Sequence, residues 1–226
     1  NPRATRTVPF LSQVNRIPMP PVATRIILGK TLKELGYTDG LAQPTETVHV
    51  KAPVFSFAKL AKVEPFLGPE MKSTGEVMGS DTTLDKALYK AFCASGYKLK
   101  DYGQVLLTIS DDTKDEAFEI AQRFAQIGYQ LIATKGTAAY LSFRGLRVLA
   151  VPKIHESESG NLLDLIRSNT IDLVINTMGK DRDATSDGFI IRREAIERGI
   201  PLFTSLDTAK AIVRVLESRS FMTRSL

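Results

Sequence analysis

Hydroxyl, amide and ammonium side chains stand at the ends of five short apolar runs in the second half of the chain. These runs span residues 105–109, 130–133, 147–151, 172–176 and 201–204. The residues at or just beyond their ends are, with one glycine among polar residues, Thr108, Ser110, Lys114, Thr134, Lys135, Gly136, Thr137, Lys153, Asn176, Thr177, Thr204 and Ser205. Ammonium groups and hydroxyls bind phosphate, and an amide can pair with a base or a ribose. The pattern is therefore typical of a site for a phosphorylated small molecule.

The stretch from Thr134 to Thr137, which reads ThrLysGlyThr, is the most informative of these ends. We expect Gly136 to let the backbone approach a ligand where a helix begins, since the first N–H groups of a helix are unpaired and attract an anion. Lys114 and Lys153 can add positive charge. Each residue alone has an ordinary structural explanation as a cap or a solvated side chain, so the prediction depends on their concurrence at one edge.

Groups that could transfer protons are sparse at the same ends. His155 lies close to Lys153 in the chain, but its surroundings are typical of an exposed loop. Asp111 and Asp112 fall in an AspAspThrLys stretch, where aspartate is common as a turn and cap residue. We expect no close pair of carboxylates at this edge, and a binding site without a general acid or base favours sensing over catalysis.

The elements that position these residues are predicted as alternating strands and helices. The helices are expected over 114–128, 137–141, 162–167, 190–198 and 209–216, each after one of the apolar runs, with Gly128 ending the first of them. Five buried strands, each followed by a helix, predict an α/β fold with a five-stranded parallel sheet, right-handed crossovers and flanking helices. The carboxyl ends of such strands share one edge, where ligands bind.

The first half of the chain has a different composition, because Pro and Gly interrupt residues 1–80 heavily. We expect a helix with Pro20 and Pro21 in its opening turn that ends near Gly36, and a strand over 48–57. A further helix is expected over 81–95, with Ser80 or Asp81 as its cap. The change in composition predicts two domains, residues 1–97 and 98–226.

Charge and composition argue against several other classes of protein. The net charge of +5 divides into +4 for residues 1–97 (12 basic, 8 acidic) and +1 for residues 98–226 (18 basic, 17 acidic), without a basic run interleaved with aromatics, so nucleic-acid binding is not expected. Cys93 is the single cysteine and there are two histidines, which argues against an internal disulfide and a structural zinc site. No apolar stretch approaches the roughly 18 residues of a membrane span, and we expect a cytoplasmic protein.

Several stretches resemble the C-terminal end of the large subunit of carbamoyl phosphate synthetase. Residues 1–10, AsnProArgAlaThrArgThrValProPhe, resemble the tail of its second ATP-grasp unit, and residues 67–79, LeuGlyProGluMetLysSerThrGlyGluValMetGly, resemble the segment that follows. AlaThrLysGlyThrAla (133–138) and IleAsnThr (175–177) resemble its effector domain, which shares the fold of methylglyoxal synthase. The resemblance implies that residues 1–97 are the C-terminal part of an ATP-grasp unit with a linker, and that residues 98–226 are an allosteric domain.

The resemblance also implies roles within a larger ligase, which makes carbamoyl phosphate from bicarbonate and glutamine-derived ammonia for pyrimidine and arginine biosynthesis. Asn1 matches the asparagine of a Glu-x-Asn motif that holds Mg²⁺ or Mn²⁺ at the ATP site, and Arg3 matches a catalytic arginine that faces the phosphorylated intermediate. Because the rest of that ATP site is missing, this chain alone is expected to be inactive. The implied protein partners are the rest of the large subunit and the small glutaminase subunit. The sequence leaves open whether the protein also forms a homo-oligomer.

The implied effectors are UMP and phosphoribosyl pyrophosphate, with IMP as a further candidate. Matching residue by residue places the following on the nucleotide-monophosphate site of the family: Thr108, Lys114, Thr134, Thr137, Lys153, Asn176 and Thr177. Ala52 and Leu202 stand where a glutamate and a tyrosine would meet ornithine, so ornithine is not expected to bind.

Two alternatives remain. One is a lyase like methylglyoxal synthase, which uses an aspartate in a GlyGlyAsp-like loop where this chain has MetGlyLysAspArgAspAla (178–184). The other is a nucleotide-sensing module of another enzyme.

Overall fold

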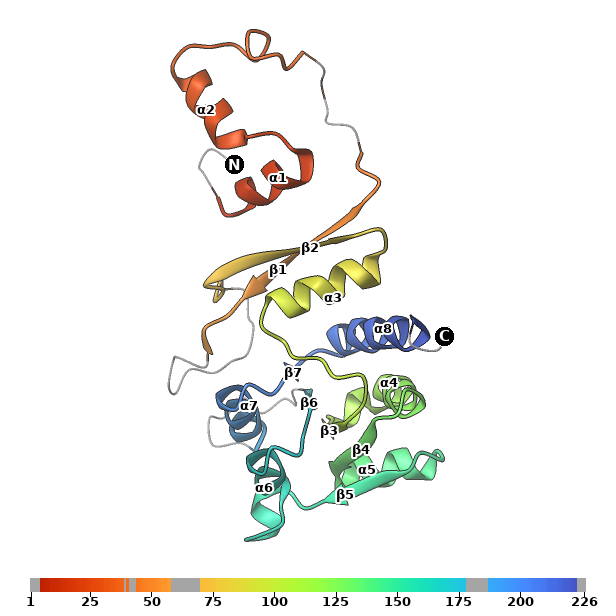
Figure 1. Ribbon diagram of the computed structural model, residues 1–226. Coiled ribbons are helices and arrows are strands. Elements are labelled where there is room, and N and C mark those ends of the chain that lie inside the picture. The colour runs from red at the N-terminus through yellow and green to blue at the C-terminus, as the bar shows by residue number, and fades with distance from the viewer. Residues whose placement is uncertain (1–4, 39, 41–43, 58–69, 178–186, 223–226) are drawn as a thin grey trace. The chain divides into compact units, whose positions relative to one another are not determined.

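The structure, a computed structural model, describes residues 5–38, 40, 44–57, 70–177 and 187–222. The chain forms two compact units (Figure 1). Unit 1 comprises residues 1–55 and 73–95, and unit 2 comprises residues 56–72 and 96–226. The assignment of the two predicted domains to an ATP-grasp unit and an allosteric domain stays a prediction.

Unit 2 is built on a five-stranded parallel sheet with the order β5-β4-β3-β6-β7. Its strands are β3 (Gln104–Thr108), β4 (Gln130–Thr134), β5 (Val148–Val151), β6 (Leu173–Asn176) and β7 (Leu202–Phe203). Its helices are α4 (Lys114–Gln126), α5 (Lys135–Phe143), α6 (Leu162–Arg167), α7 (Asp187–Glu197) and α8 (Leu206–Met222). The predicted α/β fold with a five-stranded parallel sheet and flanking helices is confirmed.

The direction in which successive strands are added across the sheet reverses once, beside β3. From β3 the chain moves outward through β4 to β5, and it then returns to the other side of β3 as β6. Loops on the two sides of β3 and β6 therefore diverge at their carboxyl ends, and open α/β sheets bind ligands in the crevice that this leaves.

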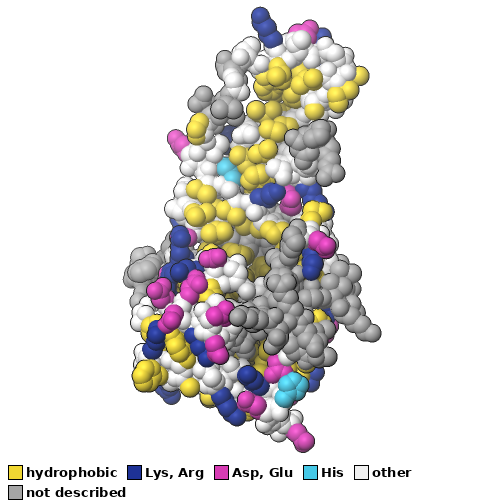
Figure 2. Space-filling model, turned by 180° about the vertical axis from the view of Figure 1, so that it is seen from behind, with side chains coloured by type: hydrophobic (Ala, Val, Ile, Leu, Met, Phe, Trp, Pro, Cys, Tyr) yellow, Lys and Arg dark blue, Asp and Glu magenta, His cyan; other side chains and the backbone are white. Residues whose placement is uncertain are grey.

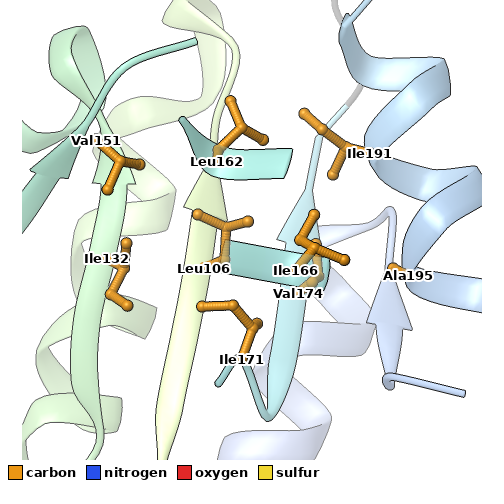
Figure 3. Close-up of a cluster of buried hydrophobic side chains, with 9 residues drawn as sticks. All are labelled: Leu106, Ile132, Val151, Leu162, Ile166, Ile171, Val174, Ile191 and Ala195. Atoms are coloured by element: carbon orange, nitrogen blue, oxygen red, sulfur yellow. The ribbon is translucent and has the colours of Figure 1, made fainter. Parts of the chain in front are cut away.

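The core on one face of the sheet joins alternate strand residues to two helices (Figure 3). Leu106, Ile132 and Val174 come from neighbouring strands, and Ile166 of α6 and Ile191 of α7 pack over them. Side chains alternate between faces along a strand, so the intervening residues of β3, β4 and β6 are buried on the opposite face. Both faces are covered, as a parallel sheet requires.

Some bounds in unit 2 differ from the sequence-based predictions. Helix α5 begins at Lys135 rather than Thr137, and α8 runs from Leu206 to Met222 rather than over 209–216. Strand β5 was predicted as buried, but Leu149 is 60% exposed. The reason is its place at the edge of the sheet, where it has one neighbouring strand.

Unit 1 holds a two-stranded antiparallel sheet covered by a helix. Its elements are α1 (Thr7–Asn15), α2 (Met19–Ile27), β1 (Val48–Val54), β2 (Gly75–Asp81) and α3 (Leu84–Ala94). A Cβ added at Gly79 of β2 would lie 2.0 Å from the carbonyl oxygen of Ala87, so this glycine lets α3 pack directly on the strand.

Three predictions in unit 1 were wrong in their bounds. Helix α2 ends at Ile27 rather than near Gly36, because Gly29 with φ +95° ends it. Strand β1 ends at Val54 rather than residue 57. Helix α3 is capped by Thr83, whose hydroxyl accepts from the Lys86 N–H, because Ser80 and Asp81 belong to β2.

The described surface of unit 2 mixes charges of both signs. In the lower part of Figure 2, Lys and Arg side chains are interspersed with Asp and Glu. Ion pairs within unit 2 include those of Arg167 and Arg198 with Glu194. In the part of the chain that the structure describes, no helix has both the length and the apolar character to cross a membrane.

Candidate functional site

A pocket of about 530 Å³ opens at the carboxyl ends of β3, β4 and β6. Pockets for small molecules commonly have this size. The predicted site residues that line it are Thr108, Lys114, Thr134, Gly136, Thr137, Lys153, Asn176 and Thr177. Lys135 is not among its lining residues; its ammonium pairs at 3.1 Å with Glu156.

The pocket lies at the carboxyl ends of β3 and β6, where the order of the strands across the sheet reverses. Thr108 and Asn176 are the last paired residues of β3 and β6, and the Thr177 N–H donates to the Thr108 carbonyl just beyond them. The first turns of α4, α5 and α7 also contribute to its walls through Lys114, Gly136 and Gly188. Strand ends and helix N-termini thus converge on one space, as the sequence predicts.

Lys114 is held in position by its neighbours. Its ammonium lies 2.6 Å from Asp111 Oδ1 and donates to the Gly136 carbonyl oxygen at 3.4 Å, and its side chain is only 16% exposed. The hydrogen bond from Lys114 lowers the pKa of Asp111, whose carboxylate is open to solvent. Lys114 therefore places a fixed positive charge beside the start of α5.

Lys153 is held differently. Its backbone N–H donates to Glu156 Oε2 at 3.2 Å and its carbonyl oxygen accepts from the Glu156 N–H at 3.1 Å, in a short 3₁₀ turn. Among the described residues its ammonium makes no hydrogen bond or ion pair. The hydrogen bonds from Lys114 to Asp111 and from Lys135 to Glu156 lower the pKa values of these carboxyls, and the charge of Lys153 acts in the same direction. This charge is available to an anion in the pocket.

The N-terminus of α5 offers backbone donors to the pocket. Thr134 precedes the helix, and its side chain makes no capping hydrogen bond. Its hydroxyl instead lies 3.5 Å from that of Thr137, which is also 3.5 Å from the Ile109 carbonyl oxygen. The first N–H groups of α5 are left without a side-chain cap, which suits an anion.

Gly136 plays a different part from the one expected. It does not have a positive φ, so its place in the helix does not require glycine. A Cβ at this position would meet only the Lys114 ammonium, at 3.8 Å. The missing side chain therefore leaves space beside Lys114 rather than permitting a special turn.

Asn176 and Thr177 also differ from their expected use. Asn176 is buried, and both ends of its amide are bound within the protein: Arg192 donates to Oδ1 at 2.7 Å, and Nδ2 donates to the Thr108 hydroxyl at 2.6 Å. The expected pairing of this amide with a base or ribose is not what the structure shows. The Thr177 hydroxyl accepts from the Ser110 N–H at 2.8 Å and so braces the loop after β3.

Three carboxylates line the pocket, those of Asp111, Glu156 and Asp187. That no two of them form a close pair for proton transfer stays a prediction. His155 does not line the pocket and is 73% exposed, as expected, but its Nε2 lies 2.7 Å from Asp187 Oδ1. That oxygen is buried and accepts no well-aligned hydrogen bond from the described residues. The sequence missed Asp187 because it is distant in the chain from every apolar run.

Several predicted residues lie outside the described part of the chain. Asn1, Arg3 and the loop over 178–184 belong to this group. The predicted catalytic arginine and metal-binding asparagine therefore have no described geometry. Within the described ranges, no three His, Cys, Asp or Glu side chains lie together as metal ligands.

The comparisons identify the domain that carries this pocket. Residues 116–204 match the family model described as MGS-like domain. This match covers less than half of the chain and supports an MGS-like domain in that range. The matched range includes β4 to β7 and most of the pocket residues, whereas Thr108 and Lys114 precede it. A solved methylglyoxal synthase from Elizabethkingia anophelis NUHP1 is 22% identical, over 51% of this chain and 79% of that one, with a TM-score of 0.41. The resemblance to the synthetase stays a prediction.

Proposed function

We propose that the MGS-like domain binds a phosphorylated small molecule and regulates an enzyme to which it is joined. The observation that carries this proposal is the convergence of Lys114, Lys153 and the uncapped N-terminus of α5 on one pocket. Two ammonium groups and a set of backbone N–H donors match the charge and the several oxygens of a phosphate.

The proposed ligands are UMP and phosphoribosyl pyrophosphate, with IMP as a further candidate. UMP and phosphoribosyl pyrophosphate share a ribose 5-phosphate, so one phosphate site can serve both. Asp187, whose Oδ1 is buried in the pocket wall 2.7 Å from His155 Nε2, is a suitable acceptor for a ribose hydroxyl, because a buried carboxylate requires hydrogen-bond donors.

We assign the domain to the large chain of carbamoyl phosphate synthetase on the resemblance of residues 1–10, 67–79, 133–138 and 175–177. In that setting the catalytic units, which use ATP with Mg²⁺ or Mn²⁺, lie elsewhere in the enzyme, together with the small glutaminase subunit. The chain itself is then a regulatory part of an ATP-dependent ligase.

A lyase like methylglyoxal synthase is the second candidate, and the pocket carboxylates favour it. A carboxylate such as Asp111 or Asp187 could take a proton from the carbon next to a substrate carbonyl, after which a phosphate held by the lysines could leave. The fold and the phosphate site would be the same for both functions, so only chemistry separates them.

A paired experiment on the 226-residue chain tests these functions. Calorimetric titration with UMP, IMP, phosphoribosyl pyrophosphate and ornithine should show saturable binding of the first and third and none of ornithine. Incubation with dihydroxyacetone phosphate should release no inorganic phosphate above a buffer blank. Phosphate release that persists through repurification would replace the regulatory proposal with the lyase, and an absence of binding by every phosphorylated ligand would remove the regulatory proposal.

A further inference from the structure

A buried arginine lies behind the pocket and was not among the predicted site residues. Arg192 of α7 is 5% exposed, and its guanidinium donates to Asn176 Oδ1 at 2.7 Å. Gly188, one turn earlier, makes room for it, since a Cβ there would lie 3.0 Å from the Arg192 NH1 atom. The side chain is thus fixed between α7 and the end of β6.

The direction of the hydrogen bonds in this group follows from the chemistry of arginine. A guanidinium has donors only, so the Asn176 atom that faces it must be the oxygen. The amide nitrogen of Asn176 then faces the Thr108 hydroxyl, at 2.6 Å, and must donate to it. Thr108 Oγ1 is therefore an acceptor in this contact, and its own proton points elsewhere.

The Thr108 proton has no acceptor among the described residues. The Asn176 contact is the hydrogen bond that this hydroxyl makes there, and Thr108 lines the pocket. Since no described residue takes this proton, an anionic oxygen bound in the pocket can accept it. The hydroxyl accepts a hydrogen bond from the Asn176 amide, and this strengthens the hydrogen bond that the hydroxyl itself donates, because hydrogen bonds in a chain polarise one another.

We propose that Arg192 is a positioning residue that acts through Asn176 to turn the Thr108 hydroxyl into a donor toward an anionic oxygen of the ligand. This inference rests on the proposed function, because it assigns one of the contacts of the phosphorylated ligand. It gives Asn176 a role in orienting Thr108 rather than in reading a base or ribose.

The test measures the cost of Thr108→Val for UMP binding in three backgrounds. In wild type the loss of a hydrogen bond to a charged oxygen should weaken UMP by about tenfold or more. In Arg192→Met the amide is free to turn, and in Asn176→Asp a carboxylate accepts the Thr108 proton. Adding Thr108→Val to either should then change the UMP dissociation constant by less than about threefold.

A matched control uses the same substitution at another arginine. Arg167 pairs with Glu194 on the surface and does not line the pocket, so Arg167→Met should preserve the full cost of Thr108→Val. Circular dichroism checks folding, and if Arg192→Met does not fold, the Asn176→Asp background decides.

The outcomes separate this inference from the proposed function. If wild type binds neither UMP nor inorganic phosphate, the proposed function fails and the inference fails with it. If wild type binds UMP but Thr108→Val costs the same in every background, Arg192 acts only as a charge or as structure, and the inference alone is wrong.

Discussion

The two pocket lysines are held in different ways, and this difference determines what their removal should do. Lys114 is largely buried and paired with Asp111, whereas the Lys153 ammonium has no partner among the described residues. Removing Lys114 also leaves the Asp111 carboxylate uncompensated beside the ligand, but removing Lys153 deletes one contact.

We predict that Lys153→Ala weakens UMP by roughly 10- to 150-fold, the value of one charge-assisted hydrogen bond. Lys114→Ala should weaken it further, since the repulsion from Asp111 adds to the lost contact. Calorimetric titration measures both. Lys210→Ala is the control, with an expected change below about twofold, because Lys210 pairs with Glu116 and neither residue lines the pocket. Equal affinity of wild type and folded Lys153→Ala would contradict this assignment of the phosphate.

Gly136 allows binding to be separated from stability. A methyl group added there would lie 3.8 Å from the Lys114 ammonium, in the space assigned to the phosphate, and the backbone does not need glycine. Gly136→Ala should therefore weaken UMP by about tenfold or more while stabilising the fold by about 0.4–1 kcal/mol. Titration and thermal unfolding of the same variant give both values, and an unchanged affinity would place the phosphate elsewhere.

At the scale of the elements, close packing of α3 on β2 depends on Gly79. A Cβ at that residue would lie 2.0 Å from the Ala87 carbonyl oxygen, whereas one at Gly75 would make an ordinary contact of 3.6 Å with Val54. We predict that Gly79→Ala destabilises unit 1 by more than about 2 kcal/mol and that Gly75→Ala, the matched control, changes its stability by less than about 1 kcal/mol. Urea unfolding followed by circular dichroism measures both, and similar values for the two would show that α3 can move away.

Tyr129 makes the stability of unit 2 depend on alkaline pH. It is buried before β4, its hydroxyl donates to the Lys100 carbonyl oxygen at 2.6 Å, and burial raises its pKa to about 12. Below pH 10 the tyrosine is protonated in both states; between pH 10 and 12 only the unfolded state loses its proton, so unfolding becomes easier. Over this range the free energy of unfolding falls by at most about 1.4 kcal/mol per pH unit.

Tyr129→Phe should lack this dependence. Urea unfolding at pH 9, 10 and 11 of wild type and the variant measures the difference between their slopes. Parallel slopes would mean that the Tyr129 hydroxyl ionises as easily in the folded protein as in the unfolded one.

The elements of unit 2 could be predicted because their apolar runs are short, unbroken and separated by helical patterns. Runs of this kind indicate parallel strands, and the strand ends then follow. The sequence could not show that Asn176 is bound at both ends, since nothing in the chain distinguishes Arg192 from its neighbour Arg193 before α7 is placed. Unit 1 was predicted less well, because β2 contains two glycines and few apolar residues and was not recognised as a strand.

At the scale of the whole molecule, the chain joins an MGS-like domain, matched over residues 116–204, to a unit of different composition. The central feature of the proposed site is a phosphate at the N-terminus of α5, between the two pocket lysines. This feature is independent of the enzyme to which the domain is joined, because the lyase alternative uses the same phosphate site.

The most direct measurement is a ¹⁵N–¹H NMR titration of the 226-residue chain with UMP. We predict that the backbone amides of Lys135, Gly136 and Thr137 shift most, because their N–H groups bind the phosphate, and that the amide of Gly79 in unit 1 does not shift. Saturable binding that leaves the amides at the start of α5 unchanged, or an absence of binding, would contradict it.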